Sequence, residues 1–534
     1  MIIHILNNRV LTFTKTDSGE YFRFIGDVIM QQGTDTLYCD SLIQNKTTNI
    51  LSAYGHVKVA QAGGTQGTCD FLKYASQTKL ALMTGDVHLT DGKNKLWCEE
   101  LTYNLGTKVG VYENNGTLTA DSTFVKSQKG IYNVNTKDAR FTGNVVVADP
   151  GYYTSSEDMG YNTESKLTHF YAQSVVTGDS GRTIIQTTGG MYDSKLGLAA
   201  FDTHSSIWYD GYYIEGDTLH YNKQTGYGYV YGNVVGMDTA HQSKMFCGKT
   251  TYNRKKRIMW AWEKPILQTV KDKDTTYMRA DTFYSAPMPI PDTVKLADTS
   301  VIKSVTIVKK EARKKEQKTA KAKGNKPPVV APVAVVDTGW ADTTAPLFFT
   351  GFHNVRIFSD SMQGVCDSIV YTQSDSTIRM IGKPILWSGK SQVTGDTVCI
   401  LLDSNKVKYV YVPNNAFVVS LAAPVKAELY NQVQGKTLKA FFKNNDITHL
   451  IVMPEAEAIY YPKDDSGRYL GVSQASSEKM SVFFNNREMK KIKLEVDVKQ
   501  TLTPLEKADL PNMRLSRFKW LDAKRPKTKE ELFD

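Results

Sequence analysis

The sequence predicts an all-β protein in which one small unit is stacked many times, so that two sheets enclose an apolar interior. Three observations support this prediction: tyrosines recur at a regular interval, turn residues follow them, and apolar and polar residues alternate in between. A period of this length indicates supersecondary units that share one continuous core. We therefore expect a long surface or groove rather than a single catalytic pocket.

The regular interval is set by tyrosines that recur every 29 to 31 residues in the first half of the chain. Nearly all are followed by Asn or Asp, which tolerate the left-handed backbone of a tight turn. We expect each tyrosine to be a half-buried rung beside its turn. These periodic tyrosines are Tyr74, Tyr103, Tyr132, Tyr161, Tyr192, Tyr221 and Tyr252.

Each unit opens with Gly, a polar residue and Val, and then alternates, as in the run from Gly55 to Val59. Alternation with a period of two and one apolar face predicts a half-buried strand that starts at the glycine. Lys58 and His88 are then expected to face water. The valines and leucines beside them are expected to face inward.

The second half of each unit contains a position at which a straight strand is impossible. It reads small residue, acid, any residue, apolar residue, any residue, Tyr, as in the run from Cys69 to Tyr74. The small and apolar residues are three apart, so the strand must bulge or bend at the acid. Stacked bends form a corner that runs along the array and lets each unit contribute to two sheets. We expect each acid to satisfy backbone donors at its own bend, because calcium-binding solenoids need a shorter, glycine-rich Asp repeat. The acids are Asp40, Asp70, Glu99, Asp217, Asp281, Asp367 and Asp396.

The six cysteines also follow the repeat, and most lie next to the acid of the corner. A cysteine that recurs at one rung indicates a small buried apolar residue. No CxxC pair is present, so we do not expect a metal site, and a disulfide between rungs would need a particular geometry. The cysteines are Cys39, Cys69, Cys98, Cys247, Cys366 and Cys399.

The formal charge of +10 does not indicate nucleic-acid binding, because it is concentrated outside the repeats. Residues 303–326 contain ten basic and two acidic residues, which gives +8, and residues 487–534 contain thirteen and nine, which gives +4. The rest of the chain therefore carries 10 − 8 − 4 = −2. A nucleic-acid-binding protein would show a basic stripe within the fold.

Two stretches interrupt or end the repeat. Pro287, Pro289 and Pro291 follow the last regular unit, and residues 303–326 have no apolar stripe, which is typical of a solvated tether. Contact of this segment with phosphates of a lipid or membrane surface is an alternative. Thr503 and Pro504 predict a short helix in a basic tail that we expect to be loosely held. The predicted segments are repeat arrays over residues 1–284 and 346–500, a linker over 285–345 and a tail over 501–534.

No export signal or membrane-spanning stretch is visible. The first residues lack a basic region, a long apolar core and a small-residue cleavage site. No stretch approaches the roughly 20 apolar residues of a spanning helix. Two expectations stay open: a cytosolic protein, or an exported one whose signal is not among these residues.

The order of the motifs resembles the OstA-like family, to which LptA and the N-terminal region of LptD belong. The motifs are Gly-Asp/Asn-Val, then Leu-Tyr-Cys-Asp (37–40) or Leu-Trp-Cys-Glu (96–99), then Tyr-Asn-x-x-Thr-Lys (103–108 and 132–137). The resemblance covers most of residues 1–284 and, more weakly, 346–495. It implies a repetitive twisted β-jellyroll, in which two stacked antiparallel sheets form a V, in two arrays joined by a linker.

The resemblance also implies a function. By this resemblance the chain is similar to a lipopolysaccharide-binding and transport scaffold in the periplasm or at the periplasmic face of the outer membrane. The resemblance implies no catalytic residue, metal or cofactor. The lipid A acyl chains would lie inside, and edge strands would pair with other jellyroll proteins of the transport bridge or translocon, or with a second copy. The candidate groove residues are the inward rungs Val28, Met30, Leu42, Val57, Val59, Leu72, Val87, Leu89, Leu101, Val145, Val147 and Leu219.

Two other classes of protein are alternatives. A polysaccharide lyase on a parallel β-helix would need a local cluster of acids and bases, whereas the acids here are spread one per unit. An extracellular or surface β-solenoid could bind glycan or protein through its outer face. Rows of aromatic residues that could serve such binding are Trp208, Tyr209, Tyr212 and Tyr213, and Trp260 and Trp262.

Overall fold

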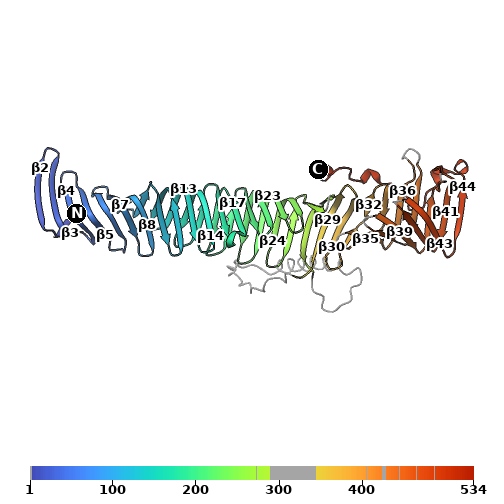
Figure 1. Ribbon diagram of the computed structural model, residues 1–534, viewed down its shortest axis with the longest axis horizontal. Coiled ribbons are helices and arrows are strands. Elements are labelled where there is room, and N and C mark those ends of the chain that lie inside the picture. The colour runs from blue at the N-terminus through green and yellow to red at the C-terminus, as the bar shows by residue number, and fades with distance from the viewer. Residues whose placement is uncertain are drawn as a thin grey trace, which may run out of the picture.

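The computed structural model describes residues 3–271, 274–288, 344–403, 406–423, 428–443, 446–464, 466–485 and 488–533. In this part of the chain the strands stack into a long rod, with the first strands at one end and the last at the other (Figure 1). The 44 strands form one hydrogen-bonded network in which every pairing is antiparallel. None of the described helices is long and apolar enough to cross a membrane. The structure confirms the predicted all-β class.

The rod has two walls that meet at a corner. We call the wall that holds the periodic tyrosines the tyrosine wall and the other the opposite wall. The long strands cross the corner and contribute one half to each wall. They are β3 (Gly19–Gln32), β4 (Asp35–Asn45), β5 (Ile50–Ala60), β6 (Gln66–Ala75), β7 (Leu80–Thr90), β8 (Asn94–Asn104), β13 (Asp138–Asp149), β14 (Tyr152–Asn162), β23 (Tyr227–Asp238), β24 (Ser243–Asn253), β29 (Leu347–Phe358) and β30 (Gln363–Thr372).

The remaining strands are shorter and belong to one wall each. The tyrosine wall contains β2 (Val10–Thr16), β9 (Val109–Tyr112), β12 (Lys129–Asn133), β15 (Leu167–Phe170), β18 (Gly190–Asp193), β19 (Leu198–Phe201), β22 (Thr218–Asn222), β25 (Ile258–Trp262), β28 (Thr282–Pro287), β31 (Thr377–Ile381), β34 (Thr397–Asp403), β35 (Lys406–Val412), β38 (Thr437–Lys443), β39 (Asp446–Met453), β42 (Lys479–Asn485) and β43 (Glu488–Glu495). The opposite wall contains β1 (Ile3–Asn7), β10 (Gly116–Ala120), β11 (Thr123–Ser127), β16 (Ser174–Gly178), β17 (Thr183–Thr187), β20 (Ser205–Tyr209), β21 (Tyr212–Gly216), β26 (Ile266–Lys271), β27 (Asp274–Arg279), β32 (Ile385–Ser388), β33 (Ser391–Thr394), β36 (Ala416–Leu421), β37 (Tyr430–Gly435), β40 (Ala456–Tyr460), β41 (Val472–Ser477) and β44 (Lys499–Thr503).

In β3, β5, β7, β13 and β23 the corner is built by a glycine and the residue after it, both with a left-handed backbone, whereas in β29 His353 and Asn354 take these positions. In β5, φ is +71° at Gly55 and +44° at His56, and the register with β6 shifts between Tyr54 and Val57. The predicted strand start at the glycine is therefore wrong: β5 begins five residues earlier, and the glycine lies at its bend. Periodicity alone missed this, because the two unpaired residues reset the alternation on either side of the bend.

The corner acids are paired, but not in the way the sequence suggested. Four of their carboxylates bond to the side chain of a left-handed corner residue on the next strand. Asn233 donates to Asp217 at 2.7 Å, Asn354 to Asp281 at 2.9 Å, and Asn415 to Asp396 at 2.9 Å. His56 and Asp40 form the same pair with an imidazole at 2.8 Å. The acids thus link successive strands rather than serve only their own bends.

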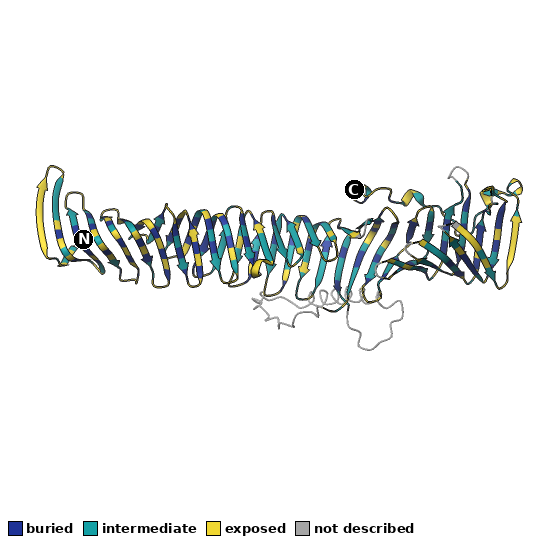
Figure 2. Cartoon of the chain, viewed as in Figure 1, coloured by how far each residue is buried: buried dark blue, intermediate teal, exposed yellow. Residues whose placement is uncertain are grey.

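The apolar core is a continuous strip between the two walls, visible as dark bands along the rod (Figure 2). The cysteines belong to it as predicted: all six are free thiols, and all except the half-buried Cys399 are buried. Burial raises the pKa of Cys69 to about 12, helped by nearby Asp70, so the thiol stays neutral. Lys58 and His88 are exposed on the other strand face, also as predicted.

Both walls continue directly from the first predicted array into the second. On the tyrosine wall β28 pairs with β29, and on the opposite wall β27 pairs with β29. The predicted linker begins too early, because residues 285–287 still belong to β28 and Pro287 lies opposite Leu347. Pro287 is tolerated because it is the last residue of its strand. Residues 289–343, which hold the rest of that linker and its lysines, lie outside the described residues.

The C-terminal tail is packed against the rod, which corrects the expectation of a loose tail. It returns from β44 along the outer face of the opposite wall (Figure 1), where buried glutamines bond to its backbone. The amide groups of Leu515 and Leu521 donate to Gln432 at 2.9 Å and Gln392 at 2.8 Å. Leu532 is fully buried. In the tail, short 3-10 turns replace the predicted helix: η3 (Leu505–Lys507), η4 (Leu510–Asn512), η5 (Asp522–Lys524) and η6 (Glu530–Leu532). One more 3-10 turn, η1 (Asp179–Gly181), lies within the first array.

The corner predicts a specific sensitivity to Gly85→Ala. A Cβ at Gly85, where φ is +77°, would lie 2.5 Å from Oδ2 of Asp70, whereas a Cβ at Gly92, where φ is +93°, would meet nothing within 4 Å. Gly92→Ala is the matched control and should cost about 1–2 kcal/mol for the left-handed backbone alone. Gly85→Ala should cost more in chemical denaturation, and Asp70→Ala should recover part of the difference. Equal losses at both glycines would contradict this account of the corner.

Candidate functional site

Opposite the corner, the free ends of the two walls face each other along a line that we call the seam. One side consists of the opposite-wall turns, such as Gln61–Thr65, and the other of the tyrosine-wall turns, such as Leu105–Lys108. Backbone hydrogen bonds join neighbouring turns on each side, as from Leu105 N–H to the Lys79 carbonyl (2.9 Å). Among the described residues no backbone hydrogen bond crosses the seam. Side chains alone hold it together.

Polar side chains bridge the seam over much of the first array. Nζ of Lys137 lies 2.6 Å from Oδ2 of Asp91, and this carboxylate also accepts from the Tyr132 hydroxyl at 3.0 Å. Further along, Lys223 donates to the hydroxyl of Tyr152 at 3.3 Å. Periodic tyrosines lie directly beneath these bridges.

The bridge at Asp91 is the most enclosed of these ion pairs. The side chain of Asp91 is 5% exposed and that of Lys137 is 29% exposed. Burial by itself raises the pKa of Asp91, but hydrogen bonds from Lys137, Asn94 and Lys93 outweigh it and hold this pKa well below its ordinary value. The seam is therefore closed here by a charged, hydrogen-bonded cluster.

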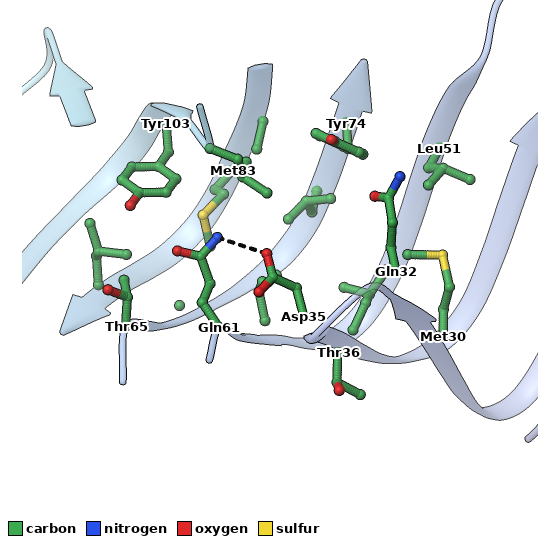
Figure 3. A pocket seen from close by; sticks show the side chains of 17 residues that line it. Met30, Gln32, Asp35, Thr36, Leu51, Gln61, Thr65, Tyr74, Met83 and Tyr103 are labelled. Atoms are coloured by element: carbon green, nitrogen blue, oxygen red, sulfur yellow. Dashed lines mark hydrogen bonds between the residues drawn. The ribbon is translucent and has the colours of Figure 1, made fainter. Parts of the chain in front are cut away.

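A cavity of about 60 Å³ remains between the walls near the N-terminal end of the rod (Figure 3). Its wall is apolar and its rim, at the seam, is polar. On the opposite-wall side of the rim, Gln61 donates to Asp35 at 3.3 Å. The lining residues are Met30, Gln32, Asp35, Thr36, Leu37, Leu51, Val59, Gln61, Thr65, Gly67, Leu72, Tyr74, Ala81, Met83, Leu89, Tyr103 and Leu105.

The hydroxyl of Tyr103 is an unpaired polar group in this cavity. Tyr103 is 4% exposed, and its hydroxyl has no hydrogen-bond partner in the described structure. Burial and nearby Asp35 raise the pKa of Tyr103 to about 12, so the group stays a protonated donor. Buried polar groups are normally bonded, and the unpaired donor therefore marks a position where a ligand atom could accept.

The predicted groove residues all face the interior, where Val59 is half-buried and the others are buried. The structure divides them by distance from the corner. Val57 and Val87, next to the corner, lie where the V is narrowest and are closely packed. The predicted residues that line the cavity are Met30, Val59, Leu72 and Leu89.

The periodic tyrosines lie deeper than expected at the start of the array. Tyr74, Tyr103, Tyr132 and Tyr161 are buried rather than half-buried, whereas Tyr252 is 42% exposed. The reason is the seam, which covers the first tyrosines from above. Lys108 and Lys137 end the Tyr-Asn-x-x-Thr-Lys motif, and with Lys166 they follow the same 29-residue period. That period gave no sign that they reach across the seam.

A second hollow lies on the outer face of the tyrosine wall. It is lined by Tyr227, Tyr229, Tyr231, Lys249, Thr251 and Trp262. The rings of Trp260 and Trp262 are parallel, with centroids 5.9 Å apart. In the described part of the chain, no group of three or more His, Cys, Asp or Glu residues is placed to hold a metal ion.

The bridge at Asp91 predicts a pH-dependent loss of stability in Asp91→Asn. A carboxylate whose pKa is lowered by folding contributes stability that is complete above its unfolded pKa of about 4 and is lost as pH falls through the folded value. At pH 7 the variant should lose about 1–3 kcal/mol, and the difference from the parent should shrink below about pH 4. Denaturation at several pH values measures it. Asp121→Asn, at a 67% exposed carboxylate bridged to Lys166, is the control and should change little; a constant difference at all pH values would refute the assignment.

Comparison with known protein families gives a match over one region of the chain. Residues 2–158 match the model of the OstA-like protein family. No curated protein matches the chain. Among solved structures, it is similar to LptH from Pseudomonas aeruginosa, described as the LptA homologous periplasmic component of a lipopolysaccharide transport device, at 15% identity over 27% of this chain and 95% of LptH, with a TM-score of 0.21. The likeness to the OstA-like family thus covers residues 2–158, the first part of the rod.

Proposed function

We propose that this protein is a lipopolysaccharide-binding and transport scaffold of the periplasm or the periplasmic face of the outer membrane. In this proposal the lipid A acyl chains pass between the two walls, while the sugars and phosphates stay outside the seam. The observation that carries it is the apolar interior, which runs between walls that, in the described part of the chain, side chains alone join at the seam. The family match over residues 2–158 supports it.

The cavity between the walls is too small for a whole lipid chain. Sites that bind small molecules usually measure about 300–1,000 Å³, whereas the cavity measures about 60 Å³. A chain can therefore enter only if the walls separate. The corner is crossed by continuous backbone, so separation must occur at the seam.

Partition of the acyl chains from water is the driving force in this proposal. Each buried methylene contributes about 0.8 kcal/mol, so one long chain can offset the separation of a few seam contacts. No catalytic residue is required. Direction of transport would come from an energy source elsewhere.

The ends of the rod would join this protein to others. At the first end, every residue of β2 is exposed, with Leu11 and Phe13 each 54% exposed. At the other end, Leu502 of β44 is 55% exposed. Exposed edge strands are templates for pairing with another chain, and other jellyroll proteins of a transport bridge or a second copy would fit there.

Self-association through these edges predicts a mass that depends on concentration. Light scattering on a dilution series of the full chain should show larger species at high concentration. Phe13→Lys, which puts a charge on the edge of β2, should shift the series toward monomer, and His88→Lys, on β7 away from both edge strands, should not. A monomer at all concentrations in the parent would contradict end-to-end pairing.

Photo-crosslinking tests where lipopolysaccharide binds. Leu89 and His88 are neighbours on β7, but Leu89 lines the cavity and His88 is exposed on the other face. With p-benzoylphenylalanine at Leu89, we expect an adduct when purified protein is mixed with lipopolysaccharide and irradiated. At His88 we expect none. Adducts at His88 alone would refute transport between the walls.

The aromatic hollow favours a second candidate function, an extracellular or surface β-solenoid that binds glycan or protein through its outer face. Flat rings beside hydroxyl groups suit the stacking and hydrogen bonding of sugar rings, and Lys249 lies 5.8 Å from the centre of the Trp262 ring. A third crosslinker at Trp262 separates the candidates. Adducts there with the saccharide portion, and none at Leu89, would favour the second function.

A further inference from the structure

Three lysines bridge the seam at a regular interval, and we call these bridges latches. Lys108, Lys137 and Lys166 each end a tyrosine-wall turn and have left-handed φ values of +62°, +64° and +64°. Their Nζ atoms reach across to Gln61 at 2.7 Å, Asp91 at 2.6 Å and Asp121 at 2.9 Å, respectively. Each partner is the first residue after an opposite-wall strand.

The series of latches weakens toward the N-terminal end of the rod. Lys137 and Lys166 bind carboxylates, whereas Lys108 binds the neutral amide of Gln61. The preceding lysine of the series, Lys79, has the same left-handed backbone, with φ +57°, but is exposed. The position opposite it, the first after β3, is Gly33, which has no side chain to complete a latch. The seam is therefore unlatched at this point.

The cavity extends from this unlatched part of the seam to the neutral latch at Gln61, which also lines it. Gln32 and Asp35, on either side of Gly33, line the cavity, and so does Tyr103 (Figure 3). The next periodic tyrosine differs, because the hydroxyl of Tyr132 is bonded to Asp91 and Asn94. Room in the interior and a free donor thus lie between the missing latch and its neighbour, the neutral latch of Lys108 with Gln61.

We propose that the seam between Gly33 and Lys79 is the lateral port through which an anionic amphiphile inserts its apolar chain between the walls. This rests on the proposed function, and it adds the place of entry and the chemistry of the headgroup. Lys79, exposed at the port, supplies a positive charge that complements an anionic headgroup. An oxygen at the neck of the amphiphile accepts from the Tyr103 hydroxyl. The charged latches at Asp91 and Asp121 keep the adjoining seam closed.

A latch can be added at the port to test this proposal. Gly33 has φ +63°, and a Cβ there would meet nothing within 4 Å. Asp121 adopts the same backbone region at the equivalent position, with φ +53°. Gly33→Asp therefore places a carboxylate opposite Lys79, and Gly33→Asn is the neutral control of the same shape.

The experiment measures association of dansyl-undecanoic acid with the full chain by stopped-flow fluorescence. Gly33→Asp should slow association by about two- to fivefold, as expected for one partly exposed ion pair, and high salt should restore the rate. Gly33→Asn should associate like the parent. Lys108→Met, which removes the neutral latch, should speed association. Tyr103→Phe removes a hydroxyl that is buried and unpaired in the free protein. It should nevertheless raise the dissociation constant for the probe, because in this proposal that hydroxyl donates to the bound probe.

The outcomes separate this proposal from the proposed function. Absence of probe binding in the parent would count against both. Binding in the parent with unchanged rates in Gly33→Asp and Lys108→Met would refute the port alone. Faster association in Lys137→Met than in Lys108→Met would place entry in the latched seam and also overturn the port.

Discussion

The structure depends on the corner, where a strand turns from one wall into the other without leaving its hydrogen-bonded ladder. Two successive left-handed residues make the turn at Gly55, and only glycine fits the first position there, because Asp40 of the neighbouring strand occupies the space of a side chain. Since the turn recurs along the rod, the two walls share strands and face each other over one continuous apolar strip. The interior and the seam both follow from this geometry.

The two edges of the V are held by forces of different kinds. Covalent backbone crosses the corner, and the side-chain bonds between Asp217 and Asn233 tie its strands together. At the seam, isolated polar contacts such as that of Lys137 with Asp91 are the only ties found among the described residues. Each such contact is weak compared with a buried hydrocarbon chain. A molecule of this design opens along one line and keeps its strand order while it does so.

The tail adds a second layer to the later part of the rod. Gln392 and Gln432 are fully buried beneath it, and each bonds in both directions, donating to the carbonyls of Lys519 and Met513 at 2.8 and 3.0 Å. Further back, Arg279 of β27 donates to the carbonyl of Leu532 at 2.9 Å. The tail thus reaches from the last strand to the junction of β27 with β29 and covers the opposite wall on its outer side.

The repeat, the alternation and the broken period next to Asp70 were sufficient to predict an all-β stack, its corner, its buried cysteines and the inward direction of residues such as Val87. These features depend on contacts between neighbouring strands, which recur in the sequence at short range. Strand limits were harder to predict, because the bend at Gly55 hides the five residues before it.

Tertiary structure alone decided how far the interior is filled, which lysine meets which acid across the seam, and that the tail is bound. Latch partners lie 45 to 47 residues apart in the sequence. The buried glutamines lie 81 to 129 residues from the tail residues that they bind. Such contacts depend on how closely two walls or a returning segment approach, and periodicity carries no information about that distance.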